Sequence, residues 1–287
     1  MQLGVVFPQT EIGADPGPVR DYALAAEAAG YQHLLAYDHV LGADPDRPGG
    51  FTGPYTHETL FHEPLVLFGY LAAITQRMEL VTGILILPQR QTALVAKQAT
   101  EVDVLSSGRL RLGVGVGWNA VEYEALGEDF HTRGRRVEEQ IALLRQLWSE
   151  PVVNFEGLYH SVSRAGLKPL PAKRSIPIWM GGMSDPVLDR VGRVADGWFP
   201  QYRDPDQLAG GIEQVHAIAR TANRDPASIG IESGLRLTGD VAADAETAHR
   251  WVEAGATHLS VNTMGLGYDS AGQHIEAIER FRTAYQP

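Results

Sequence analysis

The chain has 287 residues, 44% of them hydrophobic, which is enough for one large core. It carries 24 Lys and Arg against 35 Asp and Glu, a formal charge of −11, so we expect no nucleic-acid partner. Cysteine is absent, which excludes disulfides, thiolate metal sites and a cysteine nucleophile. The first residues lack a signal-peptide pattern and no apolar run reaches the ~18 residues of a membrane span. We therefore expect a cytoplasmic protein without a membrane partner.

Short apolar strands alternate with amphipathic helices along the whole chain. The predicted strands are 3–7, 34–37, 80–87, 109–118, 176–180, 197–199, 230–237 and 258–262. The predicted helices are 19–29, 63–76, 91–105, 133–148, 185–195, 205–221, 244–254 and 270–284. Eight strand and helix pairs that close on themselves predict an α/β fold, a (β/α)8 TIM barrel, with 1–287 as a single domain.

Two insertions interrupt this alternation. Residues 41–62 are rich in Gly, Pro and His, lack a clear period and follow the second strand. Because connections from strand to helix lie on the face of a barrel that carries active sites, this βα insertion is a candidate lid. Residues 151–175 lie between a helix and a strand and include a hairpin that turns at Glu156 and Gly157, so we expect it to be structural.

The fourth strand, RLRLGVGVGW from Arg109 to Trp118, alternates branched residues with glycine. Gly113, Gly115 and Gly117 would weaken a strand unless a ligand approaches the main chain at its carboxyl end. Gly115, Gly117 and Ala120 also match the G-x-G-x-x-A pattern of dinucleotide-binding folds. No acidic strand end follows at the required distance, so we discount that match.

Asp38 and His39 directly follow the second strand. A histidine at this end of a barrel suits general acid and base work, because an imidazole gives or takes a proton near neutral pH. The alternative is a capping or packed histidine. His57, Glu58 and His62 are similar to the zinc-protease pattern, but the two histidines are five positions apart rather than four. We therefore expect no metal site.

The turn Gly181-Gly182-Met183-Ser184 leads from the fifth strand into a helix that starts with Asp185 and Pro186. Free amide groups at such a helix start bind an anion such as a phosphate. The alternative is a tight turn that the Asp side chain caps.

Two long segments, LSSGRLRLGVGVGWNAVEYEALGEDFHTRGRRVEEQIALLRQLW over 105–148 and IPIWMGGMSDPVLDRVGRVADGW over 176–198, carry a family resemblance. The chain resembles the luciferase-like monooxygenase superfamily, and within it the oxidoreductases that depend on coenzyme F420, a deazaflavin. The resemblance extends over nearly the whole chain. It implies a flavin or deazaflavin ring across the carboxyl ends of the barrel strands, a small-molecule substrate and a homodimer.

The resemblance also implies roles for individual residues. His39 would lie beside the hydride-transfer position, Asp38 would contact the cofactor, and the bond Gly83–Ile84 would be a cis peptide. The implied cofactor-binding residues are Asp38, Thr82, Gly83, Ile84, Gly115, Gly117, Trp118, Gly181, Gly182, Met183 and Ser184. The implied substrate pocket consists of Gln9, His57, Trp118 and Trp198.

One position departs from the family pattern. In the sugar-phosphate dehydrogenases of this branch a catalytic glutamate follows the fourth strand, and Trp118 stands there in this chain. A tryptophan donates no carboxyl proton but can wall an apolar pocket. The sequence therefore predicts an F420-dependent oxidoreductase with His39 as its catalytic residue. The alternatives are an FMN-dependent monooxygenase and a non-catalytic protein that binds a flavin or deazaflavin.

Overall fold

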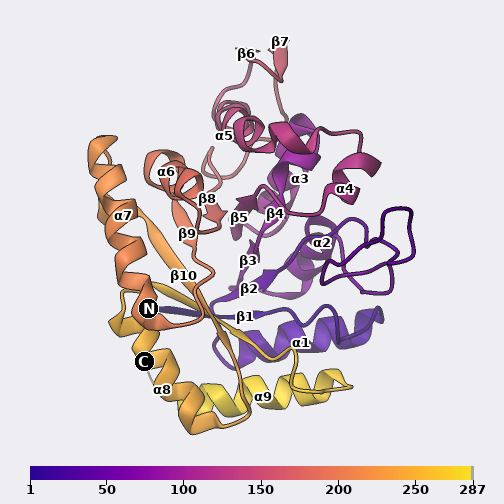
Figure 1. The fold of residues 1–287 in the computed structure, drawn as a ribbon, viewed down its shortest axis with the longest axis vertical. Helices are drawn as coiled ribbons and strands as arrows, with labels where there is room; N and C mark the ends of the chain where they lie inside the picture. Colours follow the sequence, from indigo (N-terminus) through magenta and orange to yellow (C-terminus); the bar gives the residue numbers. More distant parts are fainter. Residues whose placement is uncertain (286–287) are drawn as a thin grey trace.

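The computed structural model describes residues 1–285, and within them eight parallel strands close into a barrel surrounded by helices (Figure 1). The barrel strands are β1 (Gln2–Val6), β2 (His33–Ala36), β3 (Glu79–Thr82), β5 (Leu110–Gly115), β8 (Ile178–Gly181), β9 (Gly197–Phe199), β10 (Gly230–Arg236) and β11 (His258–Asn262). They pair in the order β3-β2-β1-β11-β10-β9-β8-β5, and pairing of β3 with β5 closes the ring. The predicted barrel is confirmed. The single domain over 1–287 stays a prediction, and residues 286–287 lie outside the described part.

Helices cover the outside of the barrel. Those found within residues 1–285 are α1 (Pro16–Ala28), α2 (Pro64–Ile74), α3 (Thr92–Leu105), α4 (Ala120–Ala125), α5 (Arg133–Ser149), α6 (Asp185–Val194), α7 (Leu208–Thr221), α8 (Val241–Glu253) and α9 (Ala271–Ala284). Asp15, Glu63 and Asp240 accept hydrogen bonds from first-turn amides of α1, α2 and α8. Helices α1 and α8 therefore begin earlier than predicted. None of the helices in this part of the chain is both long and apolar enough to cross a membrane.

The third strand is interrupted, which corrects the prediction of one strand over 80–87. β3 pairs with β2 as far as Thr82, and β4 (Leu85–Ile86) then pairs with β5. The bond Gly83–Ile84 between them is cis, as the resemblance implied. A 3₁₀ turn, η1 (Leu87–Gln89), follows. The apolar run thus spans two short strands and a turn, because unbroken hydrophobicity does not reveal where the pairing with β2 ends.

The two predicted insertions are present. Residues 41–62 form irregular structure beside α2, with one bridge between Ala43 and Thr56. In the second insertion, β6 (Val153–Glu156) and β7 (Ser161–Ala165) form an antiparallel hairpin that projects from one end of the molecule (Figure 1). Glu139 of α5 accepts hydrogen bonds from the hairpin turn, and these contacts hold the hairpin against the helix.

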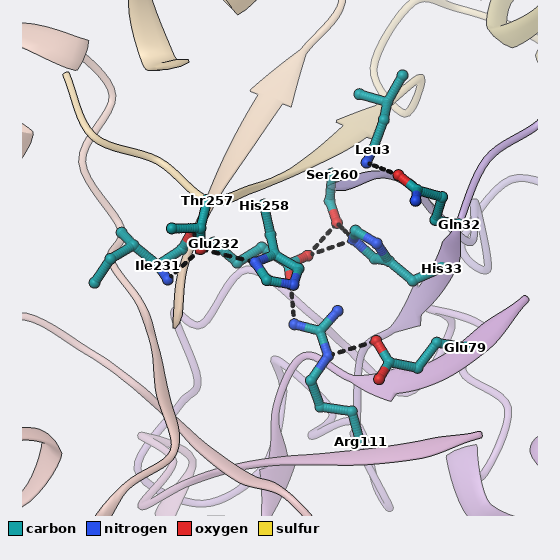
Figure 2. Close-up of polar contacts among 10 residues, drawn as sticks. All are labelled: Leu3, Gln32, His33, Glu79, Arg111, Ile231, Glu232, Thr257, His258 and Ser260. Carbon is teal, nitrogen blue, oxygen red and sulfur yellow. Dashed lines mark hydrogen bonds and ion pairs between the residues drawn. The ribbon is translucent and has the colours of Figure 1, made fainter. Parts of the chain in front are cut away.

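Charged side chains fill the amino-terminal end of the barrel interior, where such barrels usually hold branched apolar residues. Figure 2 shows Glu232 of β10 in contact with His33 Nε2 at 2.9 Å, with Ser260 and with Arg111, which also pairs with Glu79. Glu232 and Arg111 are both 2% exposed. Burial by itself raises the pKa of Glu232, but the charges of His33 and Arg111 outweigh it and hold that pKa well below its ordinary value.

His258 of β11 lies beside this cluster, with its ring 4.8 Å from the ring of Trp179. Burial first, and the charge of Arg111 second, lower the pKa of His258 to about 3. An unfolded histidine has a pKa of about 6.5. Between these two values the unfolded chain binds a proton that the folded chain does not bind, so acidification favours unfolding.

We therefore expect His258 to reduce the free energy of unfolding by up to about 2 kcal/mol between pH 7 and pH 5. Urea unfolding at both pH values measures this loss. In His258→Asn the pH dependence should be shallower by this amount, whereas the exposed His249→Asn should behave like the unchanged protein. Equal pH dependence in all three proteins would contradict the assignment.

Candidate active site

His39 follows β2 at the carboxyl end of the barrel, and aromatic rings enclose it. Its ring centroid lies 5.0 Å from that of Tyr55, 4.8 Å from Phe61 and 5.6 Å from Trp118. Tyr55 and Phe61 belong to the 41–62 insertion, while Trp118 follows β5. Only 9% of the His39 side chain is exposed. The insertion and the end of the fourth barrel strand thus meet around one imidazole.

One ring nitrogen of His39 faces a buried carboxylate. Glu122 of α4 has no exposed surface, and its Oε2 lies 3.2 Å from His39 Nδ1. Its Oε1 accepts hydrogen bonds from the backbone amides of Val40 at 2.6 Å and Leu41 at 3.2 Å. His39 Nε2 makes no hydrogen bond within residues 1–285. Sequence reasoning did not assign a role to Glu122; its signal was an acidic first turn after the fourth strand.

Asp38 is buried in an ion pair that sequence reasoning also missed. Its Oδ1 accepts from Arg90 Nη2 at 2.7 Å and its Oδ2 from the Ile86 amide at 2.9 Å. Arg90 also pairs with Glu63 at 2.9 Å. Burial raises the pKa of Asp38, and Arg90 and the Ile86 amide oppose that shift. The pair ties the ends of β2 and β4 to the start of α2, while the predicted contact of Asp38 with a cofactor stays a prediction.

The side chain of Ile84 packs against two glycines at the barrel mouth. A Cβ on Gly115 would lie 2.6 Å from Ile84 Cδ1, and a Cβ on Gly181 would lie 2.9 Å from its Cγ2. Ile84 and Tyr37 are partly buried against an apolar cluster inside the barrel, made of Val6, Leu35, Val81, Trp179, Phe199 and Met264. The glycines therefore make room for Ile84, which forms an apolar ledge.

Gly117 and Trp118 carry the chain from β5 toward α4. Gly117 has φ +64°, a conformation that favours glycine, and a Cβ there would lie 2.7 Å from Ile86. Trp118 is 43% exposed and stacks on Phe51 with 6.2 Å between ring centroids. Trp118 is therefore a partly exposed wall that contacts both His39 and the insertion.

Three more predicted residues have different surroundings. Gln9 is fully buried and donates from Nε2 to the Tyr37 carbonyl at 3.1 Å, while its Oε1 has no partner among the described residues. Thr82 is buried and donates to the Gly113 carbonyl at 2.7 Å, so its hydroxyl joins β3 to β5. His57 is exposed on the insertion, and within residues 1–285 its ring makes no hydrogen bond or aromatic contact.

The turn after β8 keeps the start of α6 open. Gly182 has φ +128°, and Met183 is 41% exposed. Ser184 occupies the N-cap position, and its side chain makes no capping hydrogen bond. Asp185 instead accepts from Gln214 Nε2 at 3.3 Å. The alternative of an Asp-capped turn is thus wrong, because Asp185 lies inside the helix; anion binding by the free amides stays a prediction.

The prediction that Trp198 lines the substrate pocket is wrong. Its ring has no exposed surface and packs against α7, where a Cβ on Gly211 would lie 2.6 Å from it. Successive side chains of a strand point to opposite faces, and the next residue, Phe199, joins the cluster inside the barrel. Trp198 Nε1 donates to the Gly182 carbonyl at 2.7 Å, so Trp198 supports the turn from outside the barrel wall.

The site suits an organic cofactor with a flat ring and an anionic arm. The Ile84 ledge, the glycine backbone around it and the open helix start line one side, and the orphaned Oε1 of Gln9 offers a buried acceptor. Among residues 1–285, no group of three or more His, Asp and Glu side chains has the arrangement to hold a metal ion.

A family model described as luciferase-like monooxygenase matches residues 1–285. The chain belongs to the luciferase-like monooxygenase family. An uncharacterized protein of Mycobacterium tuberculosis is 35% identical over 70% of this chain and 71% of its own length. The FMNH(2)-dependent dimethylsulfone monooxygenase of Pseudomonas fluorescens is 30% identical over 88% of this chain, and the match covers 66% of that enzyme.

The same barrel occurs in a solved F420-dependent secondary alcohol dehydrogenase in complex with an F420-acetone adduct. The two structures agree with a TM-score of 0.82 over 100% of this chain and 99% of the other, at 18% sequence identity. At this identity the likeness shows the fold, and the family assignment rests on the family model.

We expect Arg90→Met to lower the free energy of unfolding by about 3 kcal/mol, because it leaves the buried Asp38 without its cation. Asp38→Asn added to this variant should restore part of the loss, since the remaining amide carries no charge. Urea unfolding measures both effects. Arg20→Met is the control, because Arg20 and Asp21 form an exposed ion pair that water screens, so its loss should hardly change the free energy of unfolding. Equal losses in Arg90→Met and Arg20→Met would contradict this account.

Proposed function

We propose that the chain is an oxidoreductase that transfers a hydride between coenzyme F420 and a small organic substrate, with His39 giving or taking a proton. The observation that carries this proposal is the environment of His39. Its Nδ1 faces a buried carboxylate, and its Nε2 has no hydrogen-bond partner among the described residues. Hydride transfer at an alcohol or carbonyl carbon requires a proton transfer at the oxygen, and a nearby imidazole provides it.

The barrel mouth offers surfaces for each part of the cofactor. The Ile84 ledge would support the flat ring, with the backbone of Gly115 and Gly117 beside it. The backbone amides of Ser184 and Asp185 at the start of α6 would hold the phosphate arm, since a helix N-terminus favours an anion. When bound, a deazaflavin supplies hydride transfer rather than oxygen activation, because carbon replaces nitrogen at its reactive ring position.

The residues around His39 favour a small, uncharged substrate. Its neighbours Tyr55, Phe61 and Trp118 are aromatic, and Phe51 extends the same wall. An aromatic wall excludes water and packs against apolar groups. Trp118 replaces the glutamate of the sugar-phosphate branch, which argues against a phosphorylated sugar. A short secondary alcohol or its ketone suits this environment.

A second candidate function is an FMN-dependent monooxygenase. The observation that favours it is the 30% identity to an FMNH(2)-dependent dimethylsulfone monooxygenase. A flat flavin would use the same ledge and glycines. The two candidates differ in their cofactor and in whether oxygen is consumed.

The experiment that tests the proposed function has two steps. Titration of the purified protein with F420 and with FMN, followed by cofactor fluorescence, should give tight binding of F420 alone. Short secondary alcohols should then reduce bound F420. Tight binding of FMN together with oxygen-dependent turnover would favour the second candidate, and binding of neither cofactor would contradict both.

We expect His39→Asn to lower turnover about 10²–10⁴-fold and to leave the Kd for F420 within about threefold, because the imidazole acts in proton transfer and the ledge is unchanged. The exposed His131→Asn should turn over at the normal rate. Unchanged turnover in His39→Asn would rule out its role.

We also propose that a second copy of the chain covers an apolar face on α2 and α3. Val66 and Tyr70, one turn apart on α2, are 69% and 39% exposed, and Leu94 and Leu105, three turns apart on α3, are 52% and 62% exposed. Residues at these spacings lie on one side of their helix. Apolar patches of this kind mark protein interfaces, and the family resemblance favours a homodimer.

Sedimentation equilibrium should therefore give the mass of two chains. We expect the double variant Val66→Glu and Leu94→Glu to sediment as one chain, because it would bury two unpaired charges at the interface. Leu158→Glu, at a 75% exposed leucine on the hairpin, is the control and should remain dimeric. A dimeric double variant would contradict this interface, and a monomeric unchanged protein would contradict the homodimer.

A further inference from the structure

We propose that Glu122 is the positioning residue that keeps the proton of neutral His39 on Nδ1 and leaves Nε2 as the atom that exchanges a proton with the substrate. The inference rests on the proposed function and adds to it a residue, an atom and a tautomer. It follows from the hydrogen bonds around one buried carboxylate.

The two oxygens of Glu122 have different partners. Oε1 accepts the amides of Val40 and Leu41, so Oε2 is the oxygen that faces His39 Nδ1 at 3.2 Å. A carboxylate offers only acceptors, and a neutral imidazole has one N–H and one lone pair. If Nδ1 carried the lone pair, two acceptors would face each other in a buried site, at the cost of an unsatisfied hydrogen bond. Nδ1 therefore carries the proton.

This arrangement suits proton transfer to and from the substrate oxygen. With Nδ1 protonated, the lone pair of Nε2 accepts the hydroxyl proton of an alcohol during oxidation, and the same atom returns it to a carbonyl oxygen during reduction. While Nε2 also carries a proton, the ring is an imidazolium, and the negative charge of Glu122 stabilises it. A buried carboxylate plays the same part beside the histidine of serine-protease triads, where its replacement by an amide gives the wrong tautomer.

A second carboxylate on the same helix, Glu124, provides a comparison that shows how unusual the surroundings of Glu122 are. Glu124 lies two residues further along α4, its side chain is 74% exposed, and it pairs with Arg47 at 3.1 Å on the surface. Glu122 has no exposed surface, and no Lys or Arg side chain among the described residues forms an ion pair with it; His39 is its side-chain partner. Of the other groups that face the imidazole, Tyr55 is the titratable one, while Phe61 and Trp118 carry no charge.

The decisive variant is Glu122→Gln, which preserves the shape and reverses one hydrogen bond. Its amide oxygen can still accept the amides of Val40 and Leu41, but its NH₂ group then points at His39 Nδ1. Since NH₂ is a donor, Nδ1 must become the acceptor and the proton moves to Nε2. The flipped amide would place NH₂ against two backbone N–H donors, so the first orientation is favoured.

Long-range ¹⁵N–¹H NMR spectra of histidine-labelled protein report which ring nitrogen is protonated, and His39→Asn identifies the His39 signals. We expect Nδ1–H in the unchanged protein and in Glu124→Gln, and Nε2–H in Glu122→Gln. Nε2–H in the unchanged protein would overturn the proposal, even if Glu122→Gln failed to fold. The same tautomer in all three proteins would overturn it too.

Kinetics with F420 and a secondary alcohol give the second readout. Glu122→Gln should lower kcat about 10²–10⁴-fold and leave the Kd for F420 within about threefold, while Glu124→Gln changes neither. A kcat within threefold of normal in Glu122→Gln would overturn the proposal. The NMR measurement does not depend on turnover. If the protein fails to use F420 but shows the tautomer change, the proposed function is contradicted and the assignment of the proton to Nδ1 is not.

Discussion

Two buried carboxylates fix the short segment that carries His39, and the geometry of the site depends on them. On one side Asp38 binds Arg90 and the Ile86 amide, and on the other Glu122 binds the amides that follow His39. A buried charge that loses its partners costs several kcal/mol. The segment therefore has one favourable position, and that position places the imidazole among the aromatic rings of the insertion. These ionic interactions fix the position of the His39 segment more than they add to the net stability of the fold.

The barrel interior divides along its axis into a charged end and an apolar mouth. At the amino-terminal end, Glu232 and Arg111 bind each other and their neighbours across several strands. At the mouth, Gly115 and Gly181 leave space for Ile84. Glycines weaken strands, so this mouth needs support from elsewhere in the barrel. The dense ion network at the far end provides cross-strand contacts where no ligand has to enter.

The barrel followed from the sequence because its strands and helices have periods that short windows reveal. The contacts of Glu122 did not follow, since His39 lies 83 positions earlier in the chain and no local pattern connects them. Trp198 was assigned to the wrong face because β9 has three residues, all of them buried, so alternation could not tell inside from outside. The aromatic residues of 41–62 lie in irregular structure, where no period indicates which way a side chain points. The sequence thus predicted where the barrel strands end better than it predicted which side chains meet at the mouth of the barrel.

The segment 115–124 connects these observations. Gly115 makes room for the Ile84 ledge, Gly117 turns the chain, Trp118 forms a wall beside His39, and Glu122 faces its Nδ1. Under the proposed function, these ten consecutive residues would support the cofactor ring, wall part of the pocket and orient the group that carries the proton. The remaining walls come from the separate 41–62 insertion, whose rings contact His39 without contributing to the barrel. Under the proposed function, changes in those rings would alter the wall beside His39, while the two carboxylates that hold its segment stay in place.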